Sequence, residues 1–216
     1  MELSERNSAI VQGPRLYRGI PIALPISTFI EERGMNFLPQ VIPDVYLLEP
    51  EPYSDERGLL RRHFCQNEFA EAGLFENVCQ SNISENPRKG TLRGFHFQQS
   101  PNKEAKVLSV VKGAIYDIVV DLRSSSSTYL SWTAFELNES NRLALYVPPG
   151  CSNAWLTMEA DTWIHYYHSE FYSPASEAGI RYDDPFFGFE WPDNPTLVSQ
   201  KDREYALFSP DKPLKF

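Results

Sequence analysis

VLSVVKGAIYDIVVDLR, residues 107–123, is the stretch from which the fold is best predicted. Its two apolar runs, residues 107–111 and 114–123, are rich in β-branched side chains and have the length of strands. Lys112-Gly113 separates them, and glycine readily adopts the positive φ of a tight turn. The pattern therefore predicts two strands joined as a hairpin.

Short segments of the same kind continue along the chain. Turn signals separate them, including the serine run at residues 124–127. Regularly spaced short strands are typical of a sandwich or a barrel, so the predicted fold class is all-β. The further strands are predicted at residues 130–137, 142–147, 154–158 and 162–167.

The ends of the chain differ from this strand-rich middle. One helix is predicted at residues 66–73, with Asn67 as its N-cap and Gly73 at its end. Residues 1–40 are charged, interrupted by prolines and weakly periodic, so we expect an extension that drapes over the domain, swaps onto a partner or is partly disordered. The domain itself is predicted to span residues 41–216, and its proline-rich tail to wrap in an ordered way as far as Asp202.

The stretch at residues 91–111, TLRGFHFQQSPNKEAKVLSVV, carries three polar groups on predicted strands. Arg93 suits a phosphate, a neutral His96 suits proton abstraction, and Lys106 suits a developing oxyanion. The three together indicate a phosphorylated carbonyl substrate that is enolised. Because simple alternation puts Arg93 and His96 on opposite faces, we expect a bulge or kink near Gly94.

Composition narrows the class of protein. The 216 residues, 42% hydrophobic and 23% charged, fit one ordinary soluble domain, and the net charge of −9 disfavours nucleic-acid binding. We expect no membrane segment and no signal peptide. Cys65, Cys79 and Cys151 are scattered without a CxxC pair, which favours reduced thiols in the cytoplasm over a disulfide framework or structural zinc.

Nine motifs together carry a family resemblance. They are YSDERG at 53–58, CQSNIS at 79–84, LRGFHFQ at 92–98, Lys106, VVDLR at 119–123, VPPG at 147–150, EFYSP at 170–174, GIRYDDP at 179–185, and EWP at 190–192 followed by SQKD at 199–202. Because the motifs occur in this order, residues 41–207 resemble the deoxysugar epimerases typified by dTDP-4-dehydrorhamnose 3,5-epimerase. The resemblance implies a cupin-type double-stranded β-helix (jelly roll) with a few short helices, a homodimer and no cofactor.

The resemblance also implies catalytic roles. His96 matches the base that removes a proton next to the 4-keto group, and Asp202 matches the carboxylate that orients it. Lys106 matches the cation near the 4-keto oxygen, and Tyr166 matches the acid on the opposite face. Two of these residues have a structural alternative: Tyr166 could serve packing in its aromatic run, and Asp202 could cap a helix or pair with Arg203.

Substrate-binding positions follow in the same way. Arg93, Gln80 and Asn82 match positions near the nucleotide diphosphate, whereas Tyr53, Arg57 and Tyr172 match positions around the base and ribose. Arg57 has a structural alternative as a turn-stabilising ion pair. The other histidines have no motif support and are interpreted as packing or surface residues: His63, His165 and His168.

Two positions depart from the family pattern. Asn153 stands where the family usually has a histidine that borders the sugar site, so the inverted carbon could differ. Arg62 stands where a glutamate commonly lies near the nucleotide base, which reverses the charge there. The nucleotide therefore stays open among dTDP, CDP, GDP and UDP.

The predicted function is epimerisation at C3 and/or C5 of a nucleotide-diphosphate 4-keto-6-deoxyhexose, by way of an enolate, in deoxysugar biosynthesis. A metal-dependent cupin is disfavoured because Asn153 replaces a potential ligand and no HxH pair occurs. Two alternatives keep the fold: a nucleotide-sugar keto-isomerase, and a non-catalytic cupin that binds sugar nucleotides. The expected partners are the substrate and a second copy of the chain, with neither nucleic acid nor membrane.

Overall fold

Two β-sheets form the body of the protein in a computed structural model, which describes residues 10–11, 34–75, 77–212 and 214–216. In the seven-stranded sheet the order is β1 (Ile10–Val11), β10 (Trp132–Asn138), β9 (Ala114–Asp121), β12 (Cys151–Thr157), β7 (Thr91–Gln98) and β14 (Glu177–Gly179), with β15 (Leu197–Val198) also paired to β7. In the six-stranded sheet the order is β2 (Met35–Pro39), β3 (Tyr46–Pro50), β11 (Ala144–Val147), β8 (Lys106–Lys112), β13 (Thr162–His168) and β6 (Gln80–Asn86).

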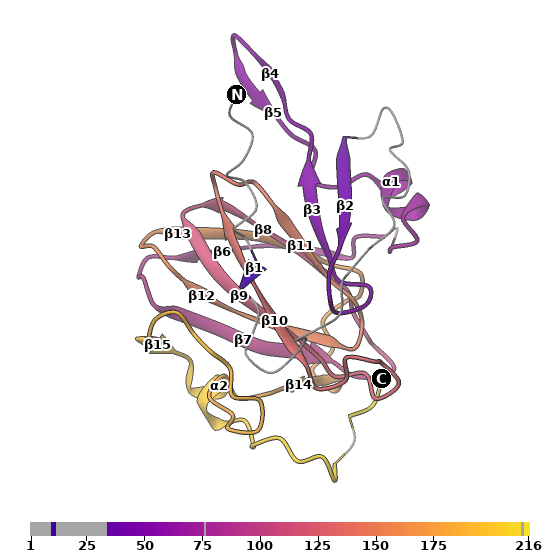
Figure 1. The fold of residues 1–216 in the computed structure, drawn as a ribbon, viewed down its shortest axis with the longest axis vertical. Coiled ribbons are helices and arrows are strands. Elements are labelled where there is room, and N and C mark those ends of the chain that lie inside the picture. The colour runs from indigo at the N-terminus through magenta and orange to yellow at the C-terminus, as the bar shows by residue number, and fades with distance from the viewer. Residues whose placement is uncertain (1–9, 12–33, 76, 213) are drawn as a thin grey trace, which may run out of the picture.

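The remaining elements lie outside these sheets. Strands β4 (Tyr53–Asp55) and β5 (Gly58–Leu60) form a separate hairpin that projects from the body (Figure 1). The helices are α1 (Gln66–Glu71) and α2 (Gln200–Glu204). This arrangement of two facing antiparallel sheets is the cupin-type jelly roll, so the predicted fold class is confirmed.

Side chains from both sheets meet in a common core. Leu108 and Ile164 of the six-stranded sheet pack with Val119, Phe135 and Leu137 of the seven-stranded sheet, and each is at most 1% exposed. Burying one such side chain contributes about 1.5–3 kcal/mol. The sandwich is therefore held together mainly by this apolar layer.

The predicted hairpin at Lys112-Gly113 is wrong. β8 pairs with β11 and β13, whereas β9 pairs with β10 and β12, so the chain crosses from one sheet to the other at this turn. β9 is covered on its second face by the cluster that contains Phe187, and β8 is covered there at Val107 by the cluster that contains Phe69. Continuous apolar runs of this kind belong in the middle of separate sheets.

The chain termini join the sandwich at its edges. β1 pairs with β10 and β2 with β3, so residues 10–11 and 35–39 of the predicted extension belong to the sheets. The rest of the prediction for residues 1–40, residues 34 and 40 aside, lies outside the described residues. The tail wraps as predicted: β15 runs parallel to β7, and α2 follows with Asp202.

The helix prediction is only partly right. Helix α1 begins after Cys65, which caps it without a side-chain hydrogen bond, so Asn67 is not the N-cap. Gly73 follows the helix end with a φ of +71°, as expected of a glycine there. Phe69 of this helix is fully buried against the outer face of the six-stranded sheet.

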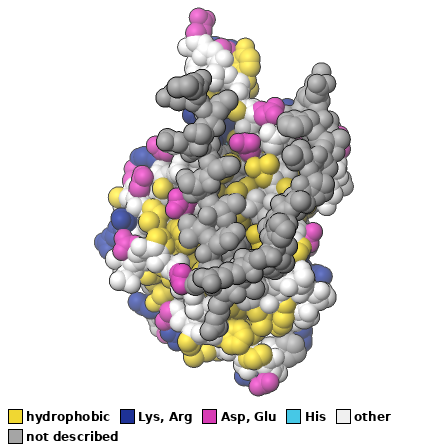
Figure 2. Space-filling view, viewed as in Figure 1, with side chains coloured by type: hydrophobic (Ala, Val, Ile, Leu, Met, Phe, Trp, Pro, Cys, Tyr) yellow, Lys and Arg dark blue, Asp and Glu magenta, His cyan; other side chains and the backbone are white. Residues whose placement is uncertain are grey.

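Charged side chains of both signs are interspersed on the face shown in Figure 2. The described Lys and Arg side chains on that face do not gather into one basic block. In the part of the chain that is described, no helix is long and apolar enough to cross a membrane.

Candidate active site

A cavity of about 250 Å³ opens between the two sheets. Its walls come from β7 and β12 of the seven-stranded sheet and from β6, β8 and β13 of the six-stranded sheet. Of the predicted site residues it is lined by His96, Lys106, Tyr166, Arg93, Gln80, Asn82, Asn153 and Tyr172.

A bulge in β7 brings Arg93 and His96 to the same cavity, which confirms the break expected near Gly94. His96 lies opposite Asn153 and Arg93 opposite Trp155, so three steps along β7 match two along β12. Gly94 has a φ of +127°, and a Cβ there would lie 2.5 Å from the Cα of Ala154. Only glycine fits this close approach of two backbones.

His96 is held by a buried carboxylate. Its Nε2 lies 2.6 Å from Oδ1 of Asp202, whose side chain is only 3% exposed. Burial raises the pKa of Asp202, but the hydrogen bond and charge of His96 outweigh this, so that pKa is lowered overall. With an ionised Asp202 accepting the proton of Nε2, Nδ1 carries the lone pair and can act as a base.

The backbone amide of Asp202 donates to the hydroxyl of Ser199 at the start of α2, 3.0 Å away. The cap of this helix is therefore Ser199 and not Asp202, whose side chain instead reaches the imidazole of His96.

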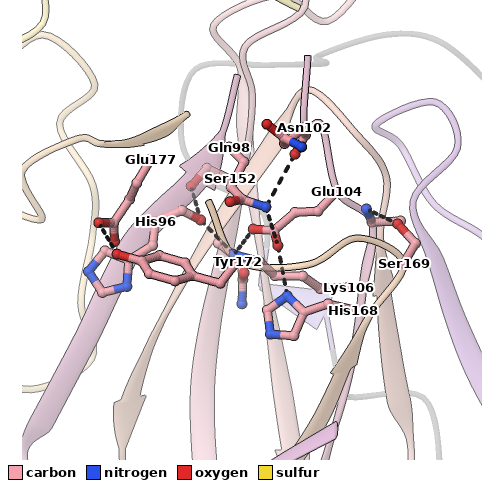
Figure 3. A network of polar contacts seen from close by, with 12 residues as sticks. His96, Gln98, Asn102, Glu104, Lys106, Ser152, His168, Ser169, Tyr172 and Glu177 are labelled. Carbon is pink, nitrogen blue, oxygen red and sulfur yellow. Dashed lines mark hydrogen bonds and ion pairs between the residues drawn. The ribbon is translucent and has the colours of Figure 1, made fainter. Parts of the chain in front are cut away.

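Lys106 extends from the first residue of β8 into the cavity. Its ammonium donates to the backbone carbonyl of His96 at 2.7 Å and lies 3.2 Å from Oε1 of Glu104 (Figure 3). The side chain is 14% exposed. A partly desolvated ammonium at a cavity wall is a group that can stabilise negative charge.

Tyr166 lies on β13, in the sheet opposite His96. Burial raises the pKa of its phenol, against a smaller opposing effect of the Arg93 charge, so the group stays protonated. The ring packs against Trp155 and His168, with centroids 5.7 Å and 5.4 Å away. An imidazole and a protonated phenol therefore face one cavity from different sheets.

Asn153 lines the cavity and bonds to a buried acid. Its side-chain amide donates to Oδ2 of Asp117 at 2.9 Å, and Asp117 is fully buried. Burial raises the pKa of Asp117 well above its usual range, although Asn153 and Lys106 oppose this. Sequence reasoning missed Asp117; its signal is a single acid inside the apolar run AIYDIVV, residues 114–120.

Glu104 and His168 also line the cavity and were not predicted there. His168 packs on Tyr166, as a packing residue would, but it also lines the cavity, where the sequence analysis did not place it. His168 and Tyr166 are two residues apart on β13, and this spacing places both side chains on one face of a strand. That alternation could have identified His168 from the sequence.

The remaining cavity positions carry hydrogen-bonding groups. The guanidinium of Arg93 donates to Asn86 at 3.0 Å, and the hydroxyl of Tyr172 donates to Glu177 at 2.8 Å. The backbone amide of Tyr172 donates to the side chain of Gln80. Tyr172 is 54% exposed and lies at the rim.

Three predicted binding residues do not line the cavity of this chain. Tyr53 and Arg57 lie on the projecting β4–β5 hairpin, where Arg57 forms the turn ion pair with Asp55. Arg62 pairs with Glu68 of α1. The projecting hairpin holds Tyr53 and Arg57 away from the two sheets (Figure 1). The ion pair with Glu68 holds Arg62 against helix α1.

The structure gives no cluster for a metal ion among the described residues, where no three His, Cys, Asp or Glu side chains lie close enough together. The fold and the cavity define a class: a cupin-type jelly roll whose cavity holds a histidine–carboxylate pair, a lysine and a phenol is a carbohydrate epimerase, an isomerase. The chain belongs to the dTDP-4-dehydrorhamnose 3,5-epimerase family, whose model matches residues 39–209.

Individual relatives agree with this assignment. The chain is 35% identical to the dTDP-4-dehydrorhamnose 3,5-epimerase of Methanothermobacter thermautotrophicus, over 79% of this chain and 92% of the relative. The crystal structure of the Bacillus anthracis enzyme with TDP and PPi bound has a TM-score of 0.77 and 32% identity, covering 81% of this chain and 99% of that one. A 3'-monoepimerase from Streptomyces bikiniensis in complex with dTDP-quinovose has a TM-score of 0.73 and 32% identity, covering 78% and 86%.

Proposed function

We propose that the chain inverts C3, C5 or both of a nucleotide-diphosphate-linked 4-keto-6-deoxyhexose. The observation that carries the proposal is the opposition of the His96–Asp202 pair on one sheet to Tyr166 on the other, across one cavity. Inversion at carbon requires one group to remove a proton and another to return one to the opposite face. Family membership supports the same reaction.

The proposed reaction has two proton transfers. Nδ1 of His96 removes a proton from the carbon next to the 4-keto group, and the electron pair of that C–H bond moves to the keto oxygen. The ammonium of Lys106 stabilises the resulting enolate oxygen. Tyr166 then donates its phenolic proton to the other face of the planar carbon. Solvent afterwards accepts the extra proton from His96 and reprotonates the phenolate of Tyr166.

The proposed substrate is a sugar nucleotide whose diphosphate lies near Arg93, Gln80 and Asn82. These three side chains lie at one cavity, and a guanidinium is well suited to phosphate oxygens. Relatives crystallised with TDP and PPi or with dTDP-quinovose support a nucleotide diphosphate ligand. One relative is described as a 3,5-epimerase and the other as a 3'-monoepimerase, so both one-carbon and two-carbon inversion fit the family.

We also propose that the chain works as a homodimer in the cytoplasm, with residues 1–40 as an N-terminal extension of the domain. Free thiols at Cys65, Cys79 and Cys151 support a reducing compartment. Sedimentation equilibrium measures the oligomeric state directly.

Deuterium exchange tests the reaction. In D₂O the enzyme should introduce deuterium at C3, C5 or both of a 4-keto sugar nucleotide, as followed by NMR. His96→Asn should lower turnover by about 10²- to 10⁴-fold with little change in substrate affinity. Tyr166→Phe should still exchange the proton on the His96 face but invert poorly. No exchange by wild-type enzyme would indicate a binding protein, and a 3-keto product would indicate a keto-isomerase.

A further inference from the structure

Glu104 lies between two nitrogen-bearing side chains at the cavity wall (Figure 3). Its Oε1 is 3.2 Å from the ammonium of Lys106, and its Oε2 is 2.8 Å from Nδ1 of His168. Gln98 donates to the same Oε2 from 3.3 Å. The side chains of Glu104, Lys106 and His168 are only 8%, 14% and 14% exposed, so these contacts are largely shielded from water.

Sheet register places His168 beside the proposed chemistry. On β13 it lies opposite Lys106 of β8 on one side and opposite Gln80 of β6 on the other. Tyr166, two residues earlier on the same strand, faces the same cavity. His165, in contrast, has its Nε2 2.9 Å from the hydroxyl of Ser81 and does not line the cavity.

The contact between Glu104 and Lys106 creates an electrostatic problem. A shielded carboxylate 3.2 Å from an ammonium cancels much of the positive charge that an enolate oxygen needs. Burial raises the pKa of Glu104, but Lys106 and His168 outweigh this and lower it overall, so the group is an anion. Donors on the second oxygen draw the carboxylate away from Lys106 and share its charge.

We propose that His168 is a positioning residue, which holds Glu104 through Nδ1 so that the Lys106 ammonium stays available to the substrate oxygen. The inference rests on the proposed function, since it concerns the enolate of that reaction. Without the Nδ1 donor, Glu104 closes on Lys106 and enolate formation slows. We expect substrate binding to change little, because His168 acts through Glu104.

Variants of His168 separate a positioning role from a structural or substrate-binding role. His168→Ala removes the donor, and His168→Phe removes it while keeping a ring. Each should lower kcat by about 10- to 100-fold, with KM changed less than about twofold. His168→Asn places an amide nitrogen near the former Nδ1 and should restore most of kcat. The matched control is His165→Ala, on the other face of the same strand, which should keep wild-type kcat.

A double-mutant cycle with Glu104→Gln gives the decisive measurement. Once the carboxylate charge is removed, adding His168→Ala should lower kcat by less than about twofold. An effect that persists in the Glu104→Gln background, a large rise in KM, or failure of His168→Asn to restore kcat would overturn the proposal. Wild-type enzyme without deuterium exchange would instead overturn the proposed function. Thermal unfolding of each variant confirms that folded protein is compared.

Discussion

At the scale of single residues, Asp117 combines full burial with incomplete hydrogen bonding. Among the described residues its Oδ2 accepts from Asn153, and its Oδ1 has no partner. Burial raises the pKa of this carboxyl well above its usual range. A raised pKa in the folded state means that the group's contribution to stability is complete below the unfolded pKa of about 3.9 and is lost as pH rises through the folded pKa.

Asp117→Asn should therefore gain stability relative to wild type as pH rises above about 4, by at most about 1.4 kcal/mol per pH unit. The amide cannot ionise, so the variant avoids the cost of burying a charge. Urea unfolding between about pH 4 and pH 8 measures the difference. A difference that stays constant over this range would mean that Asp117 is ionised in the folded enzyme.

Asp121, on the same strand, is the matched control with the opposite sign. Burial raises its pKa, but hydrogen bonds from Arg123, Ser126 and Thr128 outweigh this and lower it. A lowered pKa adds stability above the unfolded value and loses it as pH falls. Asp121→Asn should therefore become less stable than wild type as pH rises.

Some of these residues could be identified from the sequence and others could not. His96 and Lys106 stand out because they are polar positions on apolar strands. Asp202 is 106 residues from His96, and only the family resemblance pointed to it. Spacing along the chain carries no information on a contact of that range, whereas the alternation that links Tyr166 to His168 was available in the sequence.

At the scale of elements, the bulge in β7 depends on Gly94. Gly94→Ala combines a positive φ with a Cβ 2.5 Å from the Ala154 backbone, so it should destabilise the fold by more than about 3 kcal/mol. Exchange at the substrate should also be lost, because Arg93 and His96 would no longer share the cavity. Urea unfolding and the deuterium assay measure the two effects.

Gly58 is a control for Gly94, because it separates the cost of backbone strain from the cost of a steric clash. It has a φ of +122°, close to that of Gly94, but a Cβ there meets nothing within 4 Å. Gly58→Ala should therefore cost only about 1–2 kcal/mol. Equal losses from the two alanine variants would show that close packing of β7 on β12 is unimportant.

Strand positions were easier to predict than strand partners. The predicted strands over residues 154–158 and 162–167 overlap β12 and β13, because apolar and β-branched residues mark strands locally. Pairing is decided by neighbours far along the chain. The turn at Gly113 satisfies a hairpin and a crossing between sheets equally well, so the sequence could not show that β8 and β9 belong to different sheets.

At the scale of the whole molecule, an acidic protein of net charge −9 must bind an anionic substrate. Arg93 and Lys106 supply positive charge at the cavity, whereas Arg62 is paired with Glu68 on the helix side. A side chain held there does not read the nucleotide base in this chain's cavity. Within this chain's own cavity, Arg62 therefore gives no reason to expect a nucleotide other than thymidine.

Thymidine diphosphate should bind about tenfold or more tightly than the cytidine, uridine and guanosine diphosphates. Calorimetric titration of the four nucleotides measures the preference. Arg62→Ala should leave their ranking unchanged, since its guanidinium contacts Glu68. Tightest binding of another nucleotide, lost in Arg62→Ala, would assign Arg62 to the base after all.

The C-terminal tail that carries Asp202 can detach from the sheet without unfolding of the whole domain, so its attachment has a stability of its own. It joins the sheet through β15, a strand of only two residues paired to β7. Local opening of such a segment costs less free energy than unfolding the sandwich. The free energy of this local opening therefore sets the fraction of molecules that have an intact His96–Asp202 pair. We expect moderate heating to inactivate the enzyme while the two sheets remain folded.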